Sequence, residues 1–143
     1  MFKTILLPMD LNHEESWAKA LPLAKELARA GGGQLHVLAI VPDYGLSMVG
    51  AYFPDGFERS VLQRTEAEFE AFVEKHVPDL PSGQVHLAHG HIAKVIIETA
   101  ESIGADLIVM ASHQPDEVRD FMVGSKADRV VHRSPVSVLV VRG

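Results

Sequence analysis

The chain of 143 residues contains no cysteine. This absence excludes a disulfide framework, a thiol nucleophile and a cysteine-based metal site. It is compatible with a reducing compartment, so we expect a cytoplasmic protein. The amino-terminal segment also lacks a long hydrophobic run, because its short apolar stretch ends at Pro8-Met9-Asp10. We therefore expect neither a signal sequence nor a membrane-inserted segment there.

Positive charge is scarce. The 13 lysine and arginine residues are outnumbered by 19 aspartate and glutamate residues, which gives a net charge of −6. Because nucleic-acid binding demands a clustered basic face, nucleic acid is not an expected partner. The hydrophobic content of 47% predicts a packed core, and the length fits a single domain over residues 1–143.

Short apolar runs alternate along the sequence with stretches of helical periodicity. The runs predict strands over residues 2–9, 35–41, 85–88, 106–112 and 136–141. The periodic stretches predict helices over residues 14–30, 57–76, 92–103 and 125–133, with Pro22 causing a kink or standing in a first turn. The alternation predicts an α/β fold with an open five-stranded parallel sheet and helices on both faces.

Ligands of such sheets bind beyond the carboxyl ends of the strands, which directs attention to two loops. Asp10 ends the first predicted strand, where its carboxylate can accept hydrogen bonds from a ligand or serve as a cap or turn acid. Gly124-Ser125 precedes the last predicted helix, where the pair can receive a phosphate or simply cap the helix. From these residues alone, both alternatives stay open at each position.

Histidines cluster at His86, His89 and His91, which raises the question of a metal site. Successive strand residues point to opposite faces of a sheet, and no carboxylate cluster accompanies these histidines. We therefore expect solvent-facing or turn histidines and no bound metal.

The order of the elements, together with Pro8-Met9-Asp10, Gly90, Met110-Ala-Ser-His113, Gly124-Ser125 and Ser137-Val-Leu-Val-Val-Arg142, resembles the universal stress protein family over essentially the whole chain. Nucleotide-binding members of that family carry the motif Gly-x2-Gly-x9-Gly-[Ser/Thr]. This sequence keeps the spacing but has Ala111 and Gln114 at the first two glycines. In this respect it is similar to the small UspF-like branch, which includes ATP binders.

The resemblance implies a Rossmann-like sheet of the adenine nucleotide alpha hydrolase type that binds ATP, with Mg²⁺ as a companion ion. It implies one continuous nucleotide site. Pro8, Met9, Asp10 and Ile40 would surround the adenine; Gly90, Met110 and Ala111 would lie near the ribose; Ser112, His113 and Gln114 would line the phosphate path; and Gly124, Ser125 and Lys126 would close on the terminal phosphates.

The resemblance also implies a homodimer in which the closing strand, from Val136 to Val141, pairs across a two-fold axis, with a tetramer as the larger assembly. We expect an ATP-binding stress-response module that signals through its conformation or oligomeric state, with slow or no hydrolysis and no catalytic residue. Two alternatives stay open. One is a slow Mg²⁺-dependent ATPase in which Asp10 or Asp116 holds the metal, and the other is a nucleotide-independent dimeric interaction protein.

Overall fold

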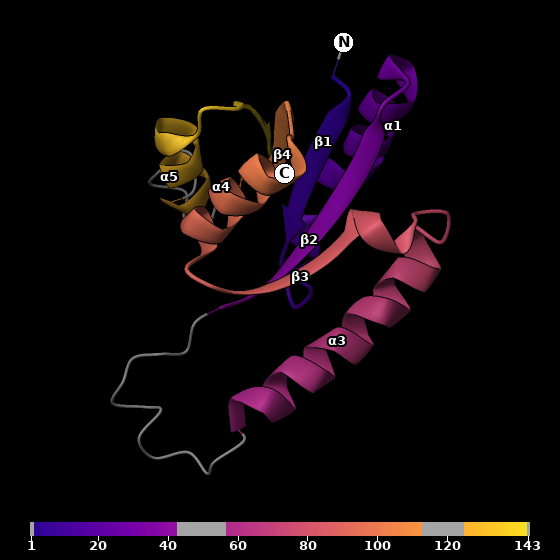
Figure 1. The fold of residues 1–143 in the computed structure, drawn as a ribbon, viewed down its shortest axis with the longest axis vertical. Helices are drawn as coiled ribbons and strands as arrows, with labels where there is room; N and C mark the ends of the chain where they lie inside the picture. Colours follow the sequence, from indigo (N-terminus) through magenta and orange to yellow (C-terminus); the bar gives the residue numbers. More distant parts are fainter. Residues whose placement is uncertain (1, 43–56, 113–124, 143) are drawn as a thin grey trace.

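The computed structural model describes residues 2–42, 57–112 and 125–142. In this part of the chain, five strands form one parallel sheet in the order β3-β2-β1-β4-β5. Figure 1 labels the first four of these strands, β1 to β4. The strands are β1 (Thr4–Met9), β2 (Gln34–Pro42), β3 (Val85–Gly90), β4 (Leu107–Ser112) and β5 (Ser137–Arg142). The expected fold class, a Rossmann-like open α/β sheet, is therefore confirmed.

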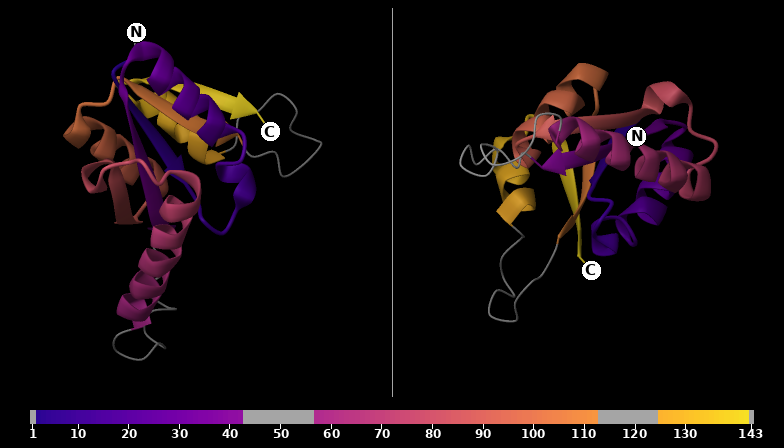
Figure 2. Two further views of the ribbon diagram at one scale, coloured as in Figure 1. Left: turned by 90° about the vertical axis from the view of Figure 1, so that its right-hand side faces the viewer. Right: turned by 90° about the horizontal axis from the view of Figure 1, so that it is seen from below.

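Helices cover both faces of the sheet, as the alternation of elements predicts (Figure 2). The four α-helices of the described residues are α1 (Ala20–Gly31), α3 (Phe57–His76), α4 (Ile92–Ile103) and α5 (Ser125–Arg133). Helices α1 and α3 share one apolar cluster with the sheet, whereas α4 and α5 share a second cluster on the opposite face. None of these described helices is both long and apolar enough to span a membrane.

The two central strands are apolar because both of their faces are covered. Ile5, Leu6 and Leu7 of β1 are fully buried, and they alternate between the two clusters. Ile108 and Val109 of β4 do the same. Because successive side chains point to opposite faces, this alternation also determines the face on which each residue at the carboxyl ends of β1 and β4 lies.

The first helix differs from the sequence-based expectation. Residues 14–30 were expected to form one helix, but Glu14–Ser16 form a separate 3₁₀ turn, η1, and α1 begins only at Ala20. Pro22 consequently stands in the first turn of α1, which is one of the two placements predicted for it. A first-turn proline is tolerated because the N–H that it lacks would have no partner within the helix.

Helix α3 reaches the expected bounds, but only its carboxyl-terminal part packs on the sheet. Phe69, Phe72 and the following Val77 are buried in the cluster shared with α1, whereas the amino-terminal part extends beyond the sheet (Figure 2). A second 3₁₀ turn, η2 (Ser82–Gln84), leads into β3. There the side-chain amide of Gln84 donates to the carbonyl oxygen of Leu35 at 2.8 Å.

Candidate functional site

The order of the strands reverses beside β1, and this reversal defines the candidate site. Strands β2 and β3 lie on one side of β1, and β4 and β5 lie on the other. The ladder between β1 and β4 ends at Leu6 and Ile108, whereas the ladder between β1 and β2 continues to Met9. The carboxyl halves of β1 and β4 therefore do not pair with each other. Open α/β sheets bind ligands at this place.

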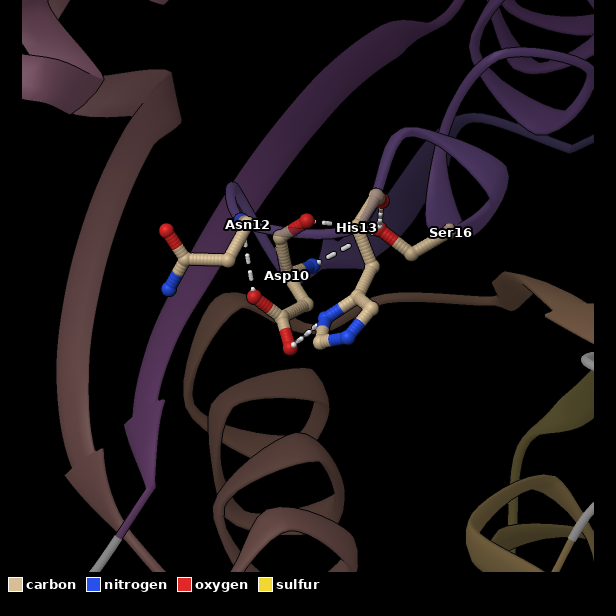
Figure 3. A network of polar contacts seen from close by, with 4 residues as sticks. All are labelled: Asp10, Asn12, His13 and Ser16. Atoms are coloured by element: carbon tan, nitrogen blue, oxygen red, sulfur yellow. Dashed lines mark hydrogen bonds and ion pairs between the residues drawn. The ribbon is translucent and has the colours of Figure 1, made fainter.

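Asp10 follows the last residue of β1, and its carboxylate is engaged by the loop that it begins (Figure 3). Its Oδ1 accepts the backbone N–H of Asn12 at 2.9 Å, and its Oδ2 lies 2.8 Å from Nδ1 of His13. Because an ionised carboxylate only accepts, the hydrogen of this second contact belongs to the imidazole. The Asp10 side chain remains 32% exposed and that of His13 56% exposed, so both are open to solvent.

Ser16 fixes the same loop from the other side. The backbone N–H of Asp10 donates to the Ser16 hydroxyl oxygen at 2.9 Å, and that hydroxyl lies 2.9 Å and 2.7 Å from the carbonyl oxygens of Asp10 and His13. Asp10 is thus a turn acid, one of the roles considered for it. It does not cap α1, whose N-cap residue is Lys19. A ligand role for its carboxylate stays a prediction.

Ser112 ends β4 and is the most unusual polar group of the site. Its side chain is only 3% exposed, and within the described part of the chain its hydroxyl has no hydrogen-bond partner. Burying an unpaired hydroxyl costs about 1–3 kcal/mol, so such groups are rare unless a ligand or an ordered water completes them. Ser112 follows Met110 by two residues, which places it on the sheet face covered by α4 and α5.

The other predicted lining residues divide between the two faces. Ile40 and Met110 belong to the cluster on the α4 and α5 face, whereas Met9 belongs to the cluster on the α1 and α3 face, against which Ala111 also packs. Pro8 is buried within β1. The structure therefore brings Ile40, Met110 and Ser112 to one face, while Met9 and Ala111 point to the other. Their contact with a ligand stays a prediction.

Gly90 ends β3 beside Pro42 of β2 and has a φ of 138°, a backbone conformation that favours glycine. A Cβ built there would lie 3.2 Å from Cγ2 of Val95, in the first turn of α4. Glycine thus allows the chain to turn closely onto α4 at the carboxyl edge of the sheet. This is a structural reason for the residue, and it is compatible with the predicted position near a ribose.

His113, Gln114, Asp116 and Gly124 lie outside the described residues. Ser125 begins α5, and Lys126 is its second residue. The amino-terminal end of a helix presents unpaired N–H groups and the positive end of the helix dipole, which is the arrangement expected for phosphate contact.

The expectation that these histidines face solvent is correct in part. His89 and His91 are exposed, and no group of three or more metal-ligating side chains occurs among residues 2–42, 57–112 and 125–142. His86, however, is only partly exposed. Its Nε2 lies 2.9 Å from Nδ1 of His36, which is only 8% exposed on the neighbouring strand.

Burial lowers the pKa of both imidazoles, and the charge of His86 lowers the pKa of His36 further. A neutral hydrogen-bonded pair is therefore favoured, since one ring must accept the hydrogen that the other donates. His36 was not singled out from the sequence. The available signal was a histidine inside an otherwise apolar predicted strand.

Comparisons with known proteins give the same family as the sequence. The family model described as the universal stress protein family matches residues 1–142. Universal stress protein G of Escherichia coli O157:H7 is 29% identical over 144 residues, covering 99% of this chain and 100% of the relative. A universal stress protein of Thermus aquaticus is 32% identical over 145 residues, with 99% and 100% of the two chains covered.

Among solved structures, a universal stress protein in complex with cAMP superposes with a TM-score of 0.61 at 20% identity, covering 99% of this chain and 97% of the other. At this identity the likeness supports the fold alone. The UspF-like branch stays a prediction. The family model that matches residues 1–142, together with the relative that is 32% identical over 99% of this chain, shows that this chain belongs to the universal stress protein family.

Proposed function

We propose that this chain binds ATP at the carboxyl ends of β1 and β4 and acts as a stress-response signalling module, with slow or no hydrolysis. The observation that carries the proposal is the buried Ser112 hydroxyl, which has no partner within the described residues. It stands at the reversal of strand order, on the same face as Ile40 and Met110. A ligand hydroxyl or phosphate oxygen would complete its hydrogen bonding.

Asp10 and the start of α5 supply the rest of the proposed contacts. Asp10 would accept a hydrogen bond from the adenine, and the unpaired N–H groups at the start of α5 would meet the phosphates. The relative solved with cAMP supports a nucleotide as the ligand class. The same proposal places Mg²⁺ with the phosphates of the nucleotide.

Slow or absent hydrolysis is favoured over efficient ATPase activity. Both carboxylate oxygens of Asp10 are engaged by donors of its own loop, and a metal ion would have to replace the His13 contact. Asp116, the other acid considered for Mg²⁺, lies outside the described residues. An ATPase therefore remains the alternative that measured turnover would revive.

We further propose that the protein is a homodimer, or a dimer of such dimers, through β5. This strand stands at the edge of the sheet, and Leu139, Val140 and Val141 remain partly exposed there. An apolar edge strand invites pairing with another strand, and a two-fold symmetric pair would cover both edges at once. The absence of cysteine from the sequence supports action in the cytoplasm.

The experiment is titration calorimetry of the nucleotide-stripped protein with Mg-ATP, after which the nucleotide is recovered and identified by chromatography. Micromolar binding with intact ATP is the expected result. Recovered ADP would favour the ATPase, and absence of binding would favour the interaction-only protein. ADP, AMP and cAMP are titrated in parallel to define the length and form of the phosphate chain.

Ser112→Ala tests the same proposal, because this variant should raise the stability of the ligand-free protein and lower its affinity for ATP. Removing an unpartnered buried hydroxyl should stabilise the ligand-free protein by up to about 1–2 kcal/mol. The loss of a hydrogen bond to the ligand should weaken ATP binding by roughly 5- to 30-fold. Ser102→Ala is the matched control, since Ser102 is exposed on α4 and donates to the carbonyl oxygen of Thr99. Unchanged ATP affinity in Ser112→Ala would remove Ser112 from the site.

A further inference from the structure

His36 and His86 connect an edge strand of the sheet to its inner neighbour. Strand β3 stands at the edge and pairs with β2 in a ladder that runs from Val37 and Val85 to Pro42 and Gly90. Nδ1 of His36 lies 2.9 Å from Nε2 of His86. The imidazole contact thus lies across the place where the two strands begin to pair.

Both histidines lie on the face of the sheet that α4 covers. Their neighbours along the strands contribute to the cluster shared with α1 and α3, namely Leu35, Val37, Val85 and Leu87. Because successive strand residues alternate between the faces, His36 and His86 lie on the other one. His36 is buried there, whereas His86 is partly exposed. The ring of His86 therefore has the shorter path to water.

Strand β3 has little apolar burial of its own to hold it in place. Every residue of β3 is at least partly exposed, whereas Val37 and Leu38 of β2 are completely buried. The side-chain amide of Gln84 donates to the carbonyl oxygen of Leu35 at 2.8 Å and is a second polar contact at the same end. Elements with little buried apolar surface open at a lower free energy than the core. The attachment of β3 is therefore sensitive to a change at the histidine pair.

The imidazole contact tolerates one extra proton but not two. In the neutral pair, one ring donates its hydrogen and the other accepts it. A single imidazolium can still donate to its neutral partner, although its charge is then removed from water. When both rings are protonated, each of the facing nitrogens carries a hydrogen and neither can accept. The two rings must then separate, and their like charges repel each other.

Other charged groups do not offset this repulsion in the described part of the chain. Burial lowers the pKa of His36, and the charge of His86 lowers it further, whereas burial lowers the pKa of His86. Strand β1 and the turn η2 contain no charged residue. On β3, His89 lies on the opposite face. The charged residues of α4 are exposed, and none of them alters the pKa of either imidazole; they are Lys94, Glu98 and Glu101.

We propose that the His36–His86 pair is a pH-sensitive switch, in which protonation of both imidazoles releases β3 from β2 while the other four strands stay paired. The inference does not depend on the proposed nucleotide site. Low pH favours the released state because an imidazole in water has a pKa of about 6.5, above that of the buried pair. Release also frees Gly90, which ends β3 shortly before α4 begins.

Amide hydrogen exchange of the full chain, followed by NMR between about pH 7.5 and 5, tests this proposal. The equilibrium constant for opening is obtained for amides of β3, β1 and β4 after correction for the intrinsic exchange rate. Below about pH 6.5, the constant for β3 should rise by up to about tenfold per pH unit for each proton taken up, and so by at most about 100-fold for two. The amides of β1 and β4 should stay more strongly protected at every pH, because the release is local.

Three variants identify the groups that titrate. The double variant His36→Leu and His86→Leu removes both imidazoles and should abolish the pH dependence of the β3 opening constant. His86→Gln keeps a donor for Nδ1 of His36 but cannot gain a charge, so its constant should rise by at most about tenfold per pH unit. His132→Ala is the matched control, because it removes an exposed histidine of α5, and it should exchange as the wild type does.

Two results would overturn the inference. Equal protection of the β3 and β1 amides would show that β3 opens only when the whole sheet unfolds. A β3 opening constant that does not depend on pH, or that depends on pH equally in the wild type and the double variant, would show that the histidine pair does not control the strand. The ATP titration tests the nucleotide site separately, and neither exchange result affects it.

Discussion

Replacing Gly33 by alanine should destabilise the fold severely, although the change adds a single methyl group. A Cβ at this position would lie 2.7 Å from the carbonyl oxygens of Phe2 and Lys3 and 2.9 Å from the carbonyl carbon of Lys3. All three atoms belong to the backbone that enters β1. They cannot rotate away as a side chain would, so the backbone itself must shift.

The shift would strain the first pairing of the sheet. The N–H of Gln34 donates to the carbonyl oxygen of Lys3 at 2.7 Å, which is one of the two oxygens that the new methyl group would strike. Overpacking costs about 1–3 kcal/mol, and a weakened backbone hydrogen bond adds about 1 kcal/mol. We therefore expect a loss of about 2–4 kcal/mol, or a melting temperature lower by about 8–15 °C.

Two further glycines provide graded controls for this prediction. A Cβ at Gly83 would meet nothing within 4 Å, and this glycine has no positive φ, so Gly83→Ala should be neutral or slightly stabilising. Gly104 is equally open but has a φ of 68°, so Gly104→Ala should cost about 1–2 kcal/mol from backbone strain alone. Urea unfolding followed by circular dichroism measures all three. A Gly33→Ala protein as stable as Gly83→Ala would show that the close approach does not constrain the backbone.

Three other predictions concern the sheet. Burial lowers the pKa of His36 and of His86, so the unfolded chain binds more protons than the folded chain below about pH 6.5. The free energy of unfolding should therefore decrease as the pH is lowered below this value, by at most about 1.4 kcal/mol per pH unit for each histidine. Urea unfolding of the double variant His36→Leu and His86→Leu should show no such pH dependence. Asp106→Ala should lower the free energy of unfolding by about 1 kcal/mol, because the carboxylate accepts the backbone N–H groups of Lys3 and Thr4. Thermal unfolding of the variant and the wild type measures this difference. Val140→Lys should make the protein monomeric by light scattering while it stays folded, since Val140 is not among the residues that pack against either core cluster in the described part of the chain; an unchanged assembly would exclude the β5 interface.

Much of the fold follows from short-range patterns in the sequence. Apolar runs and helical spacing are local properties, so all five strands and the bounds of α3, α4 and α5 could be predicted. The start of α1 was missed because Trp17 and the apolar residues after it have the spacing of a helix, although the helix itself begins only at Ala20. Trp17 is instead placed by tertiary packing, with its ring centroid 4.9 Å from that of Phe72 on α3.

The candidate site was likewise predictable from the sequence only in part. Asp10 could be singled out from the sequence because it stands at the end of a predicted strand, whereas Ser112 was implied by the resemblance to the universal stress protein family. Neither the missing partner of the Ser112 hydroxyl nor the imidazole against Asp10 could be foreseen. Hydrogen bonds depend on distances of a few tenths of an ångström, and residue spacing does not supply them.

Local periodicity and motifs were enough to predict the alternation of strands and helices, the family, and the residues that stand at strand ends. The strand order, the face that each lining residue reaches, and the pairing of His36 with His86 became known only from the folded chain. Those features arise from contacts between residues far apart in the chain. Their energies depend on burial and geometry, which exist only once the sheet has assembled.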